Sequence, residues 1–255
     1  MVNPTPNPRR RHGLWRVLGL MDWLGRYELA TLISLVLVVG SIWAFVEIAE
    51  EVVEGETHSF DETILLAMRN AKDPADPLGP KWLEELARDF TALGSVGVMT
   101  LITVTVSGFL LLQARRRATL LILAAVGGGL LISTLMKQGF DRPRPDLVPH
   151  GSYVYTTSFP SGHSMMSAVT YLTLGALLAR VQPRRQLKAY LLMIAILLTV
   201  LVGITRVYLG VHWPTDVLAG WTAGAAWALI CWLAARWLQH RGQMEPDRQM
   251  PEQLE

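Results

Sequence analysis

The chain has 255 residues, of which 51% are apolar and only 17% are charged, and its formal net charge is +2. Its length would allow one or two soluble domains, but so apolar a composition argues against them. The single cysteine, Cys231, excludes an intramolecular disulfide and disfavours a cysteine-based metal site, and we interpret it as a packing residue.

Six stretches of the chain contain no Asp, Glu, Lys or Arg, and each is roughly 16–25 residues long. A helix needs roughly 20 apolar residues to cross the hydrocarbon core of a membrane. Buried helices of a large soluble protein should instead show polar stripes with a period of about 3.6 residues, which these stretches lack. We therefore predict an all-α integral membrane bundle of six transmembrane helices. The six stretches are Leu29–Val46, Phe90–Ala114, Ala118–Met136, Ser164–Ala179, Ala189–Thr205 and Val217–Ala235.

The segment ahead of the first span, residues 1–27, begins basic and rich in proline. Apolar residues recur at helical spacing from Leu14 to Met21, which predicts a helix lying at the cytoplasmic interface or an extension of the first span. No small-residue cleavage site clearly follows the first apolar stretch, so we expect a retained span and not a signal peptide. Residues 28–238 would then form the six-span domain, and residues 239–255 a polar cytoplasmic tail.

The charges of the short loops predict an orientation in the membrane. Basic segments follow the second span, at Arg115–Arg117, and the fourth span, at Arg180–Lys188. The C-terminal tail also opens with Arg236 and Arg241. Because basic loops stay in the cytoplasm, both ends of the chain are predicted to lie there.

The extracytoplasmic side must then hold residues 47–89, 137–163 and 206–216. Apolar residues at helical spacing predict short extracytoplasmic helices near residues 60–68 and 82–90, between spans one and two. We interpret the acidic residues that open this first segment as a solvated face and not as a metal site.

Two cations follow the third span, Lys137 and Arg144. Gly139, Pro143 and Pro145 indicate that the chain has left the helix, so both cations can approach one point. A guanidinium and an ammonium suit phosphate oxygens. The alternative is that such cations only mark topology or bind lipid headgroups.

The tetrapeptide from Pro160 to His163 stands where the fourth span begins. Ser161 can cap the helix and Gly162 lets an anion approach the backbone, so the helix N-terminus favours a bound phosphate. His163 would face that anion and could protonate a leaving group. An ordinary helix start with an interfacial histidine is the alternative.

The third fragment joins the fifth and sixth spans and contains Arg206, His212 and Asp216. The four-residue separation lets the carboxylate reach one imidazole nitrogen, which leaves the other as an oriented nucleophile. Such a pair is weak by itself. Three cations, two histidines and a carboxylate on one side of the membrane together predict phosphoryl chemistry.

The three fragments together resemble the type 2 phosphatidic acid phosphatase superfamily, whose pattern is K-x6-RP, PSGH and SR-x5-H-x3-D. The first and second elements are intact, and Thr205 stands where the family usually has serine. Arg142-Pro143 offers a second Arg-Pro pair, but only Arg144-Pro145 has the family's spacing. The resemblance extends from about residue 60 to the sixth span, and six spans is also the family's architecture.

The resemblance implies that His212 attacks phosphorus and forms a phosphohistidine, that Asp216 orients His212, and that His163 protonates the leaving group. It implies that no metal or other cofactor is needed. The residues that it implies for phosphate binding are Lys137, Arg144, Ser161, Gly162 and Arg206.

We therefore expect a lipid phosphatase of the cytoplasmic (inner) membrane, with its active site on the extracytoplasmic side. Undecaprenyl diphosphate, phosphatidic acid and phosphatidylglycerophosphate are the candidate substrates. Three alternatives are a lipid phosphotransferase, a soluble vanadate-dependent haloperoxidase, which six apolar spans disfavour, and a non-catalytic transporter or lipid-binding protein. We expect no nucleic-acid partner, and the sequence leaves the oligomeric state open.

Overall fold

The computed structural model describes the backbone of residues 9–147 and 156–240 and the side chains of residues 29–147 and 156–239. By its internal contacts the chain groups into two compact units, Met1–Leu37 and Val38–Glu255. The side chains of the apolar face predicted between Leu14 and Met21 are not among the described ones, and the polar tail after residue 240 lies outside the described residues.

A single helix, α1, runs from Arg9 to Glu54 over 46 residues. It contains the first predicted span and begins ahead of it, at Arg9. In the first unit, the Ser34 hydroxyl donates to the Ala30 carbonyl at 2.8 Å, which satisfies a polar group in an apolar segment. In the second unit, Trp43 of the same helix is 66% exposed, as expected of a side chain that faces lipid.

Nine further elements follow α1 in the described part of the chain. The two short strands pair in an antiparallel hairpin that the sequence did not predict, whereas α2 and α3 cover the segments where short helices were predicted. The elements are α2 (His58–Ala67), β1 (Arg69–Asn70), β2 (Asp73–Pro77), α3 (Lys81–Ala92), α4 (Val96–Leu112), α5 (Arg116–Gly139), α6 (Gly162–Arg180), α7 (Arg185–Tyr208) and α8 (Pro214–His240).

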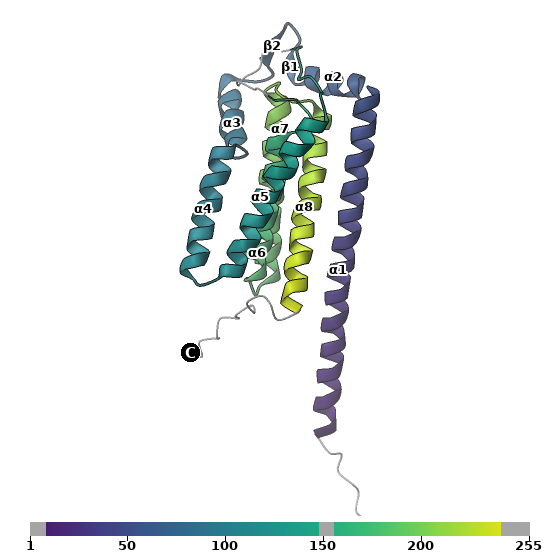
Figure 1. Cartoon of the computed structure of the whole chain (residues 1–255), viewed down its shortest axis with the longest axis vertical. Helices are drawn as coiled ribbons and strands as arrows, with labels where there is room; N and C mark the ends of the chain where they lie inside the picture. Colours follow the sequence, from purple (N-terminus) through teal and green to yellow (C-terminus); the bar gives the residue numbers. More distant parts are fainter. Residues whose placement is uncertain (1–8, 148–155, 241–255) are drawn as a thin grey trace, which may run out of the picture. The chain divides into compact units, whose positions relative to one another are not determined.

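Helix α6 is the centre of the second unit, where it packs most extensively against α7 and α8 and also against α5 (Figure 1). Its polar residues are small and buried, Ser164, Ser167 and Thr170 among them. Glycines of α8 face it so closely that a Cβ on Gly220 would lie 2.7 Å from the carbonyl oxygen of Ser161. Small residues at a helix interface allow this close approach, which brings the N-terminal ends of α6 and α8 together.

Four helical segments are long and apolar enough to cross a membrane, and α3 with α4, bent by 48°, would make a fifth. Helix α6 has 19 residues, but its serines and threonines make it less apolar than these four. By length and composition the described residues thus contain four or five spans, against the six predicted. The four segments are Leu29–Glu54, Arg116–Gly139, Arg185–Tyr208 and Pro214–Gln239.

The predicted second span is interrupted between α3 and α4. Helix α4 begins after Ser95, whose hydroxyl accepts a hydrogen bond from the Val98 backbone N–H at 3.3 Å. A serine at the N-cap favours the start of a new helix. The cap at Ser95 therefore divides one run without charged residues between two helices.

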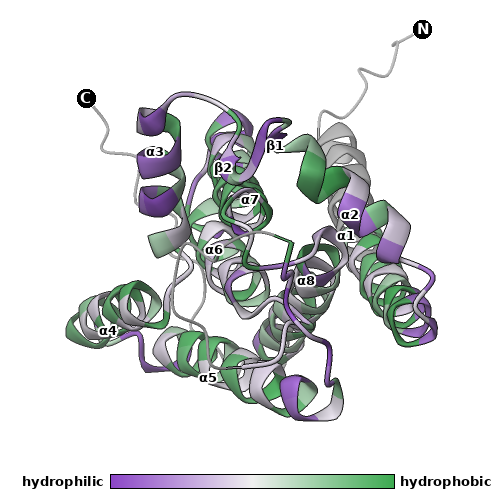
Figure 2. Cartoon of the chain, turned by 90° about the horizontal axis from the view of Figure 1, so that it is seen from above, coloured by the Kyte–Doolittle hydropathy of each residue, from purple (hydrophilic) through white to green (hydrophobic). Residues whose placement is uncertain are grey.

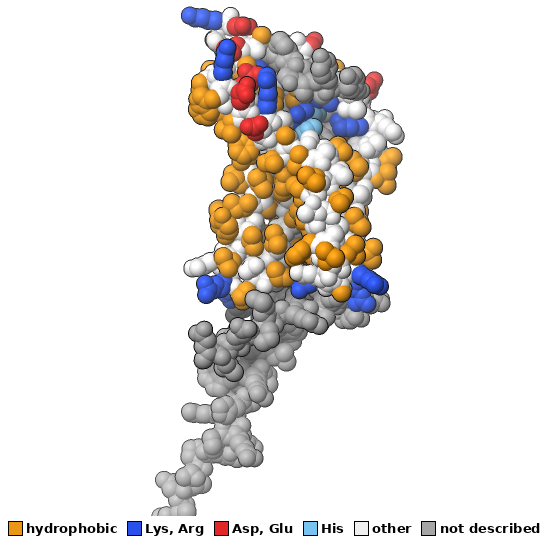
Figure 3. Space-filling view, turned by 90° about the vertical axis from the view of Figure 1, so that its left-hand side faces the viewer, with side chains coloured by type: hydrophobic (Ala, Val, Ile, Leu, Met, Phe, Trp, Pro, Cys, Tyr) orange, Lys and Arg blue, Asp and Glu red, His pale blue; other side chains and the backbone are white. Residues whose placement is uncertain are grey.

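Apolar side chains cover the middle of the molecule on the face drawn in Figure 3, between Lys and Arg at one end and mixed acidic and basic residues at the other. Seen along the helices, α3 carries hydrophilic residues on its outer side, whereas the longer helices are largely apolar (Figure 2). An apolar band between two polar ends is typical of a membrane-spanning surface.

Candidate active site

All eight residues predicted to form the site lie at one end of the second unit. Helices α5 and α7 end there, and α6 and α8 begin there. The structure brings the whole predicted set together through direct contacts and close charges. The set is Lys137, Arg144, Ser161, Gly162, His163, Arg206, His212 and Asp216.

A tight turn positions His212 between α7 and α8. Gly210 has a φ of 70°, in the left-handed region that favours glycine, and it ends α7. Helix α8 begins at Pro214, whose fixed φ suits the first helical position. Asp216, in the first turn of α8, accepts a hydrogen bond from the Trp213 backbone N–H at 2.9 Å, as capping side chains do. The same helix start brings its carboxylate to His212.

The two ring nitrogens of His212 face opposite charges. Nδ1 lies 3.2 Å from Oδ2 of Asp216, and Nε2 lies 3.1 Å from Nη1 of Arg144. Since a carboxylate only accepts and a guanidinium only donates, these contacts assign the proton to Nδ1 and the lone pair to Nε2. Burial lowers the pKa of His212 to about 3, although Asp216 opposes this effect. At neutral pH the imidazole is therefore uncharged and its Nε2 is a free base.

The Asp216 carboxylate is buried and fully hydrogen-bonded. Besides the contacts already described, its Oδ2 accepts a hydrogen bond from the Ser158 hydroxyl, and its Oδ1 accepts one from Nη1 of Arg142 at 2.6 Å. The Ser158 backbone N–H also donates to the Arg142 carbonyl at 2.9 Å, so the segment that follows α5 is tied to the segment that precedes α6. These contacts fix the plane of the carboxylate against the imidazole.

Backbone carbonyls hold two of the three cations without neutralising them. Lys137 Nζ donates to the Thr157 carbonyl at 2.9 Å, and Arg144 Nε donates to the Thr156 carbonyl at 2.9 Å. Burial lowers the pKa of Arg144, which Asp216 partly opposes. Within the described residues, no carboxylate forms an ion pair with any of the three cations. Cations in this arrangement form a site for an anion with more than one negative oxygen.

Arg206 is the most deeply buried of the three cations, at 3% exposure. Its Nη1 donates to the Thr91 hydroxyl at 3.1 Å, and its Nε has no hydrogen-bond partner among the described residues. The charge of Arg206 acts on His212, so this buried guanidinium contributes to the positive environment of the imidazole.

The start of α6 has the predicted capping arrangement. The Ser161 hydroxyl accepts from the Ser164 backbone N–H, which confirms that Ser161 caps this helix. Gly162 lies beside Lys137, and a Cβ added there would be 3.4 Å from its Cε. His163, in the first turn, packs against Gly94 at the break between α3 and α4. The helix N-terminus, Lys137 and His163 thus border the same space.

The sequence also matches known proteins. A model of the PAP2 superfamily matches residues 118–240. The phosphatidylglycerophosphatase B of Bacillus subtilis is 33% identical over 183 residues, which cover 71% of this chain and 85% of that protein. The chain belongs to the PAP2 superfamily.

Other PAP2 relatives agree with the fold. The crystal structure of a transmembrane PAP2 type phosphatidylglycerolphosphate phosphatase from Bacillus subtilis superposes with a TM-score of 0.69 at 28% identity. The superposition covers 79% of this chain and 96% of the chain in that crystal structure. An undecaprenyl-diphosphatase of Sulfolobus acidocaldarius is 38% identical over 68 residues, 27% of this chain and 29% of that protein. Together with its apolar helices, these likenesses make the chain a multi-pass membrane protein.

Four residues around the PAP2 site were not predicted from the sequence. They are Asp61, Thr91, Arg142 and Ser158. The second Arg-Pro pair was a signal for Arg142, but the family's spacing favoured Arg144. The other three carried no signal, because each reaches the site from a segment outside the three motifs.

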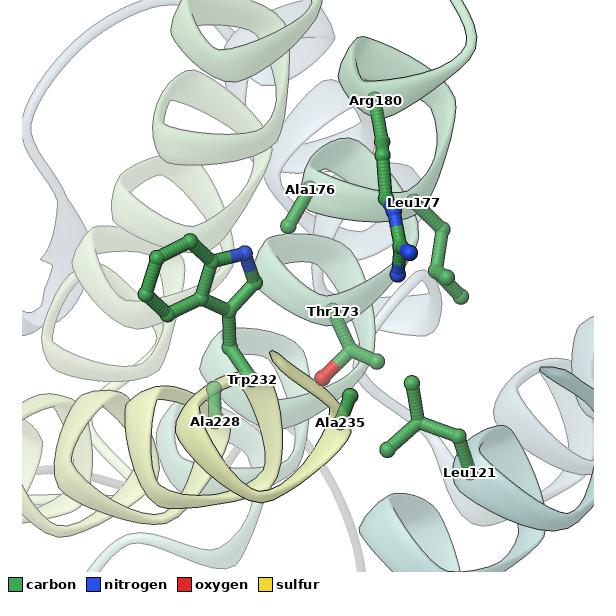
Figure 4. Close-up of a pocket in the computed structure, with 8 residues that line it drawn as sticks. All are labelled: Leu121, Thr173, Ala176, Leu177, Arg180, Ala228, Trp232 and Ala235. Carbon is green, nitrogen blue, oxygen red and sulfur yellow. The ribbon is translucent and has the colours of Figure 1, made fainter. Parts of the chain in front are cut away.

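Two cavities are lined by none of the eight predicted site residues. One, of about 20 Å³, lies between α5, α6 and α8 beside Arg180, at the opposite end of α6 from His163 (Figure 4). It has room for no more than a water molecule. The other, of about 160 Å³, is apolar and is lined by Phe45, Met136 and Trp227 among others. Its lining residues come from α1, α5 and α8.

Proposed function

We propose that the protein is a membrane lipid phosphatase that hydrolyses a lipid phosphomonoester or diphosphate through a phosphohistidine at His212. The main support is the unprotonated Nε2 of His212, 3.1 Å from Arg144 in a group of cations that no described carboxylate neutralises. A neutral nucleophile beside an anion-binding site suits attack on phosphorus.

In the first step the substrate phosphate takes the place of the contact between Arg144 and His212. Burial and the neighbouring cations lower the pKa of His163 to about 3, so His163 takes up a proton when the bound phosphate anion offsets those cations. Nε2 attacks phosphorus, the P–O bond to the lipid breaks, and the protonated His163 gives its proton to the leaving oxygen. Asp216 accepts the hydrogen bond from Nδ1 throughout and stabilises the positive charge that the imidazole acquires.

In the second step a water molecule attacks the phosphohistidine. His163, now neutral, takes a proton from that water, the P–N bond breaks, and inorganic phosphate leaves with His212 restored. Lys137, Arg144 and Arg206 bind the equatorial oxygens in both transition states, assisted by Ser161 and Gly162. We include metal independence in this proposal, because these cations would supply the charge stabilisation that metal ions supply elsewhere.

The proposed architecture has six spans, with α6 as the fourth and the six-span domain at residues 28–238. The polarity of α6 supports this assignment, since its buried serines and threonines face neighbouring helices and not lipid. By the positive-inside rule, the basic loops support a cytoplasmic location for both the N-terminal segment (1–27) and the tail (239–255). The active site, with α2 and α3, would then face the outside of the inner membrane.

The substrate class follows from the relatives and from the apolar cavity. The relatives are named for phosphatidylglycerophosphate and undecaprenyl diphosphate, and phosphatidic acid shares their phosphate group. The cavity beside Met136 offers room for part of a lipid chain.

The experiment is phosphate release from these three lipids by purified protein in detergent, with a chelator present. We expect metal-independent release that falls at least ~10³-fold in His212→Ala. Phosphate that appears on an added acceptor lipid and not in water would identify the phosphotransferase instead. Equal release by wild type and His212→Ala would refute the mechanism.

A further inference from the structure

Two members of a buried ion network beside the site, Arg142 and Asp61, have no part in the steps above. Arg142 lies between two carboxylates, those of Asp61 and Asp216, whose side chains are both 0% exposed. Its Nη1 donates to Oδ1 of Asp216 and its Nη2 donates to Oδ2 of Asp61, each at 2.6 Å. The Arg142 side chain is itself only 13% exposed. One guanidinium therefore bridges the carboxylate that contacts the nucleophile to a carboxylate on α2.

Asp61 is held as firmly as Asp216. Its Oδ1 accepts from the Thr215 backbone N–H at 2.9 Å, and its Oδ2 accepts from the Thr215 hydroxyl at 2.7 Å. That hydroxyl accepts in turn from Nη1 of Arg142 at 2.8 Å. The Thr57 hydroxyl accepts from Nη2 of Arg142 at 3.2 Å. Asp61 thus caps the N-terminus of α8 from a different helix, directly beside Asp216.

We propose that Arg142 and Asp61 are positioning residues for the nucleophile: Arg142 holds Asp216 through Oδ1 so that Oδ2 faces His212, and Asp61 holds Arg142. The catalytic role of these two residues rests on the proposed function. The contacts through which they hold Asp216 do not depend on it.

The planar fork of arginine is what the position requires. A guanidinium can bond two carboxylates at once through its separate Nη atoms, whereas a lysine ammonium is a compact point charge. Removing the cation would leave two buried carboxylates close together without a counter-charge, which is strongly unfavourable. Asp216 could then relieve the repulsion by rotating away from His212.

The network also has a favourable charge for the reaction. Two carboxylates and one guanidinium leave one net negative charge beside His212. When Nε2 bonds to phosphorus the imidazole becomes positive, and the negative network stabilises it in a buried place where charge interactions are strong. The negative charge that Asp61 adds therefore stabilises the imidazolium that forms during the attack, and not the neutral imidazole of the resting protein.

The test compares Arg142→Gln, Arg142→Lys and Asp61→Asn with wild type, by phosphate release from dioctanoyl phosphatidic acid in detergent micelles. We expect Arg142→Gln to lower kcat about 100-fold with KM within about threefold, the size typical of lost support to a reacting residue. Arg142→Lys, which keeps the charge but not the fork, should recover about tenfold of that loss. Asp61→Asn should lower kcat by roughly tenfold, since Arg142 remains.

Arg69→Gln is the matched control. Arg69 is also a buried arginine, 5% exposed, but it donates to the Tyr208 carbonyl at the end of α7, and among the described residues it forms no hydrogen bond with Asp61 or Asp216. We expect this variant to lower the unfolding midpoint while its kcat stays within about twofold of wild type. A loss of kcat equal to that of Arg142→Gln would mean that any buried arginine is needed, and would refute the positioning role.

Two further readouts separate positioning from general stability. If Arg142 acts through Asp216, the double variant Arg142→Gln with Asp216→Asn should be no slower than Asp216→Asn alone, whereas fully multiplicative losses would contradict the proposal. Nitrogen-15 NMR of labelled histidine, assigned with His212→Gln, should show a single Nδ1–H form of His212 in wild type and a mixture in Arg142→Gln. An unchanged tautomer in Arg142→Gln would overturn the proposal.

The tautomer measurement needs no turnover, so the two proposals fail separately. A wild-type protein that releases no phosphate would refute the proposed function. The positioning of His212 by Arg142 would still be decided by the NMR comparison.

Discussion

His212 combines two properties that are difficult to obtain together in one residue. It is buried, at 2% exposure, yet it lies in the same site as three cations that suit an anion, Lys137, Arg144 and Arg206. Burial keeps the imidazole neutral, and Asp216 directs its proton to Nδ1, so that Nε2 remains a base. In the proposed mechanism His212 is therefore ready to attack before the substrate binds, because the protein and not the solvent sets its protonation.

The lowered pKa of His212 predicts a pH-dependent stability. The pKa is about 3 in the folded chain, and about 6.5 is usual for an unfolded chain, so between these values only the unfolded chain binds the proton. Stability contributed by the neutral imidazole is present above pH 6.5 and is lost as the pH falls. Between pH 7 and 5, wild type should lose about 2 kcal/mol more unfolding free energy than His212→Gln.

This comparison is made by chemical denaturation in detergent at several pH values. Parallel curves for the two proteins would show that His212 titrates normally in the folded state, and would remove the basis for a neutral nucleophile in the resting protein.

At the scale of elements, the site depends on how closely α6 and α8 approach. Gly220 and Gly224 of α8 lie against α6, where a Cβ on Gly224 would be 2.5 Å from the carbonyl oxygen of Met165. The two helices begin side by side for this reason, and the Ser161 backbone N–H donates to the Asp216 carbonyl at 2.9 Å. The phosphate-binding turn of α6 and the nucleophile ahead of α8 are therefore held by one interface.

Gly224→Ala should disturb both stability and activity. The added methyl group would force α6 and α8 apart, at a cost of roughly 1–3 kcal/mol. The control is Gly127→Ala in α5, where a Cβ would meet nothing within 4 Å. Unfolding midpoints and phosphate release in detergent should fall for the first variant and not for the second. Equal behaviour of the two would show that the helix contact is not limiting.

At the scale of the whole molecule, the distribution of charge supports the proposed orientation. Basic residues occupy the two short loops at one end, at Arg115–Arg117 and Arg180–Lys188, with no acidic residue in either loop. Every acidic residue whose side chain the structure describes lies between Glu47 and Asp89 or is one of Asp141, Asp146 and Asp216, near the other end. The described site lies at the end of α6 that is far from the basic loops. Lipid headgroups on the extracytoplasmic side would reach it without crossing the bilayer.

Single-cysteine labelling tests this orientation. In a Cys231→Ser background, Asp73→Cys in the hairpin and Arg184→Cys after α6 both place a thiol at an exposed position. A membrane-impermeant maleimide applied to cells with a permeabilised outer barrier should label the first variant and not the second. Labelling of Arg184→Cys in sealed cells would reverse the orientation.

The sequence by itself determined what depends on local composition and spacing. Apolar runs predicted the long helices, and the three motifs predicted eight residues that the structure brings together, because each motif is a short segment at a helix end. Local pattern did not reveal the hairpin of residues 69–77 or the break at Ser95, where a cap divides an apolar run.

Only the tertiary structure decided which distant residues support the site. Asp61 and Arg142 are 81 residues apart, and Thr91 and Arg206 are 115 residues apart. These pairs form because α2 packs against α8 and α3 packs against α7. Neither hydrophobic periodicity nor motif spacing predicts that packing. The sequence thus provided the reacting groups, and the fold determined how they are held and which proton and charge each of them carries.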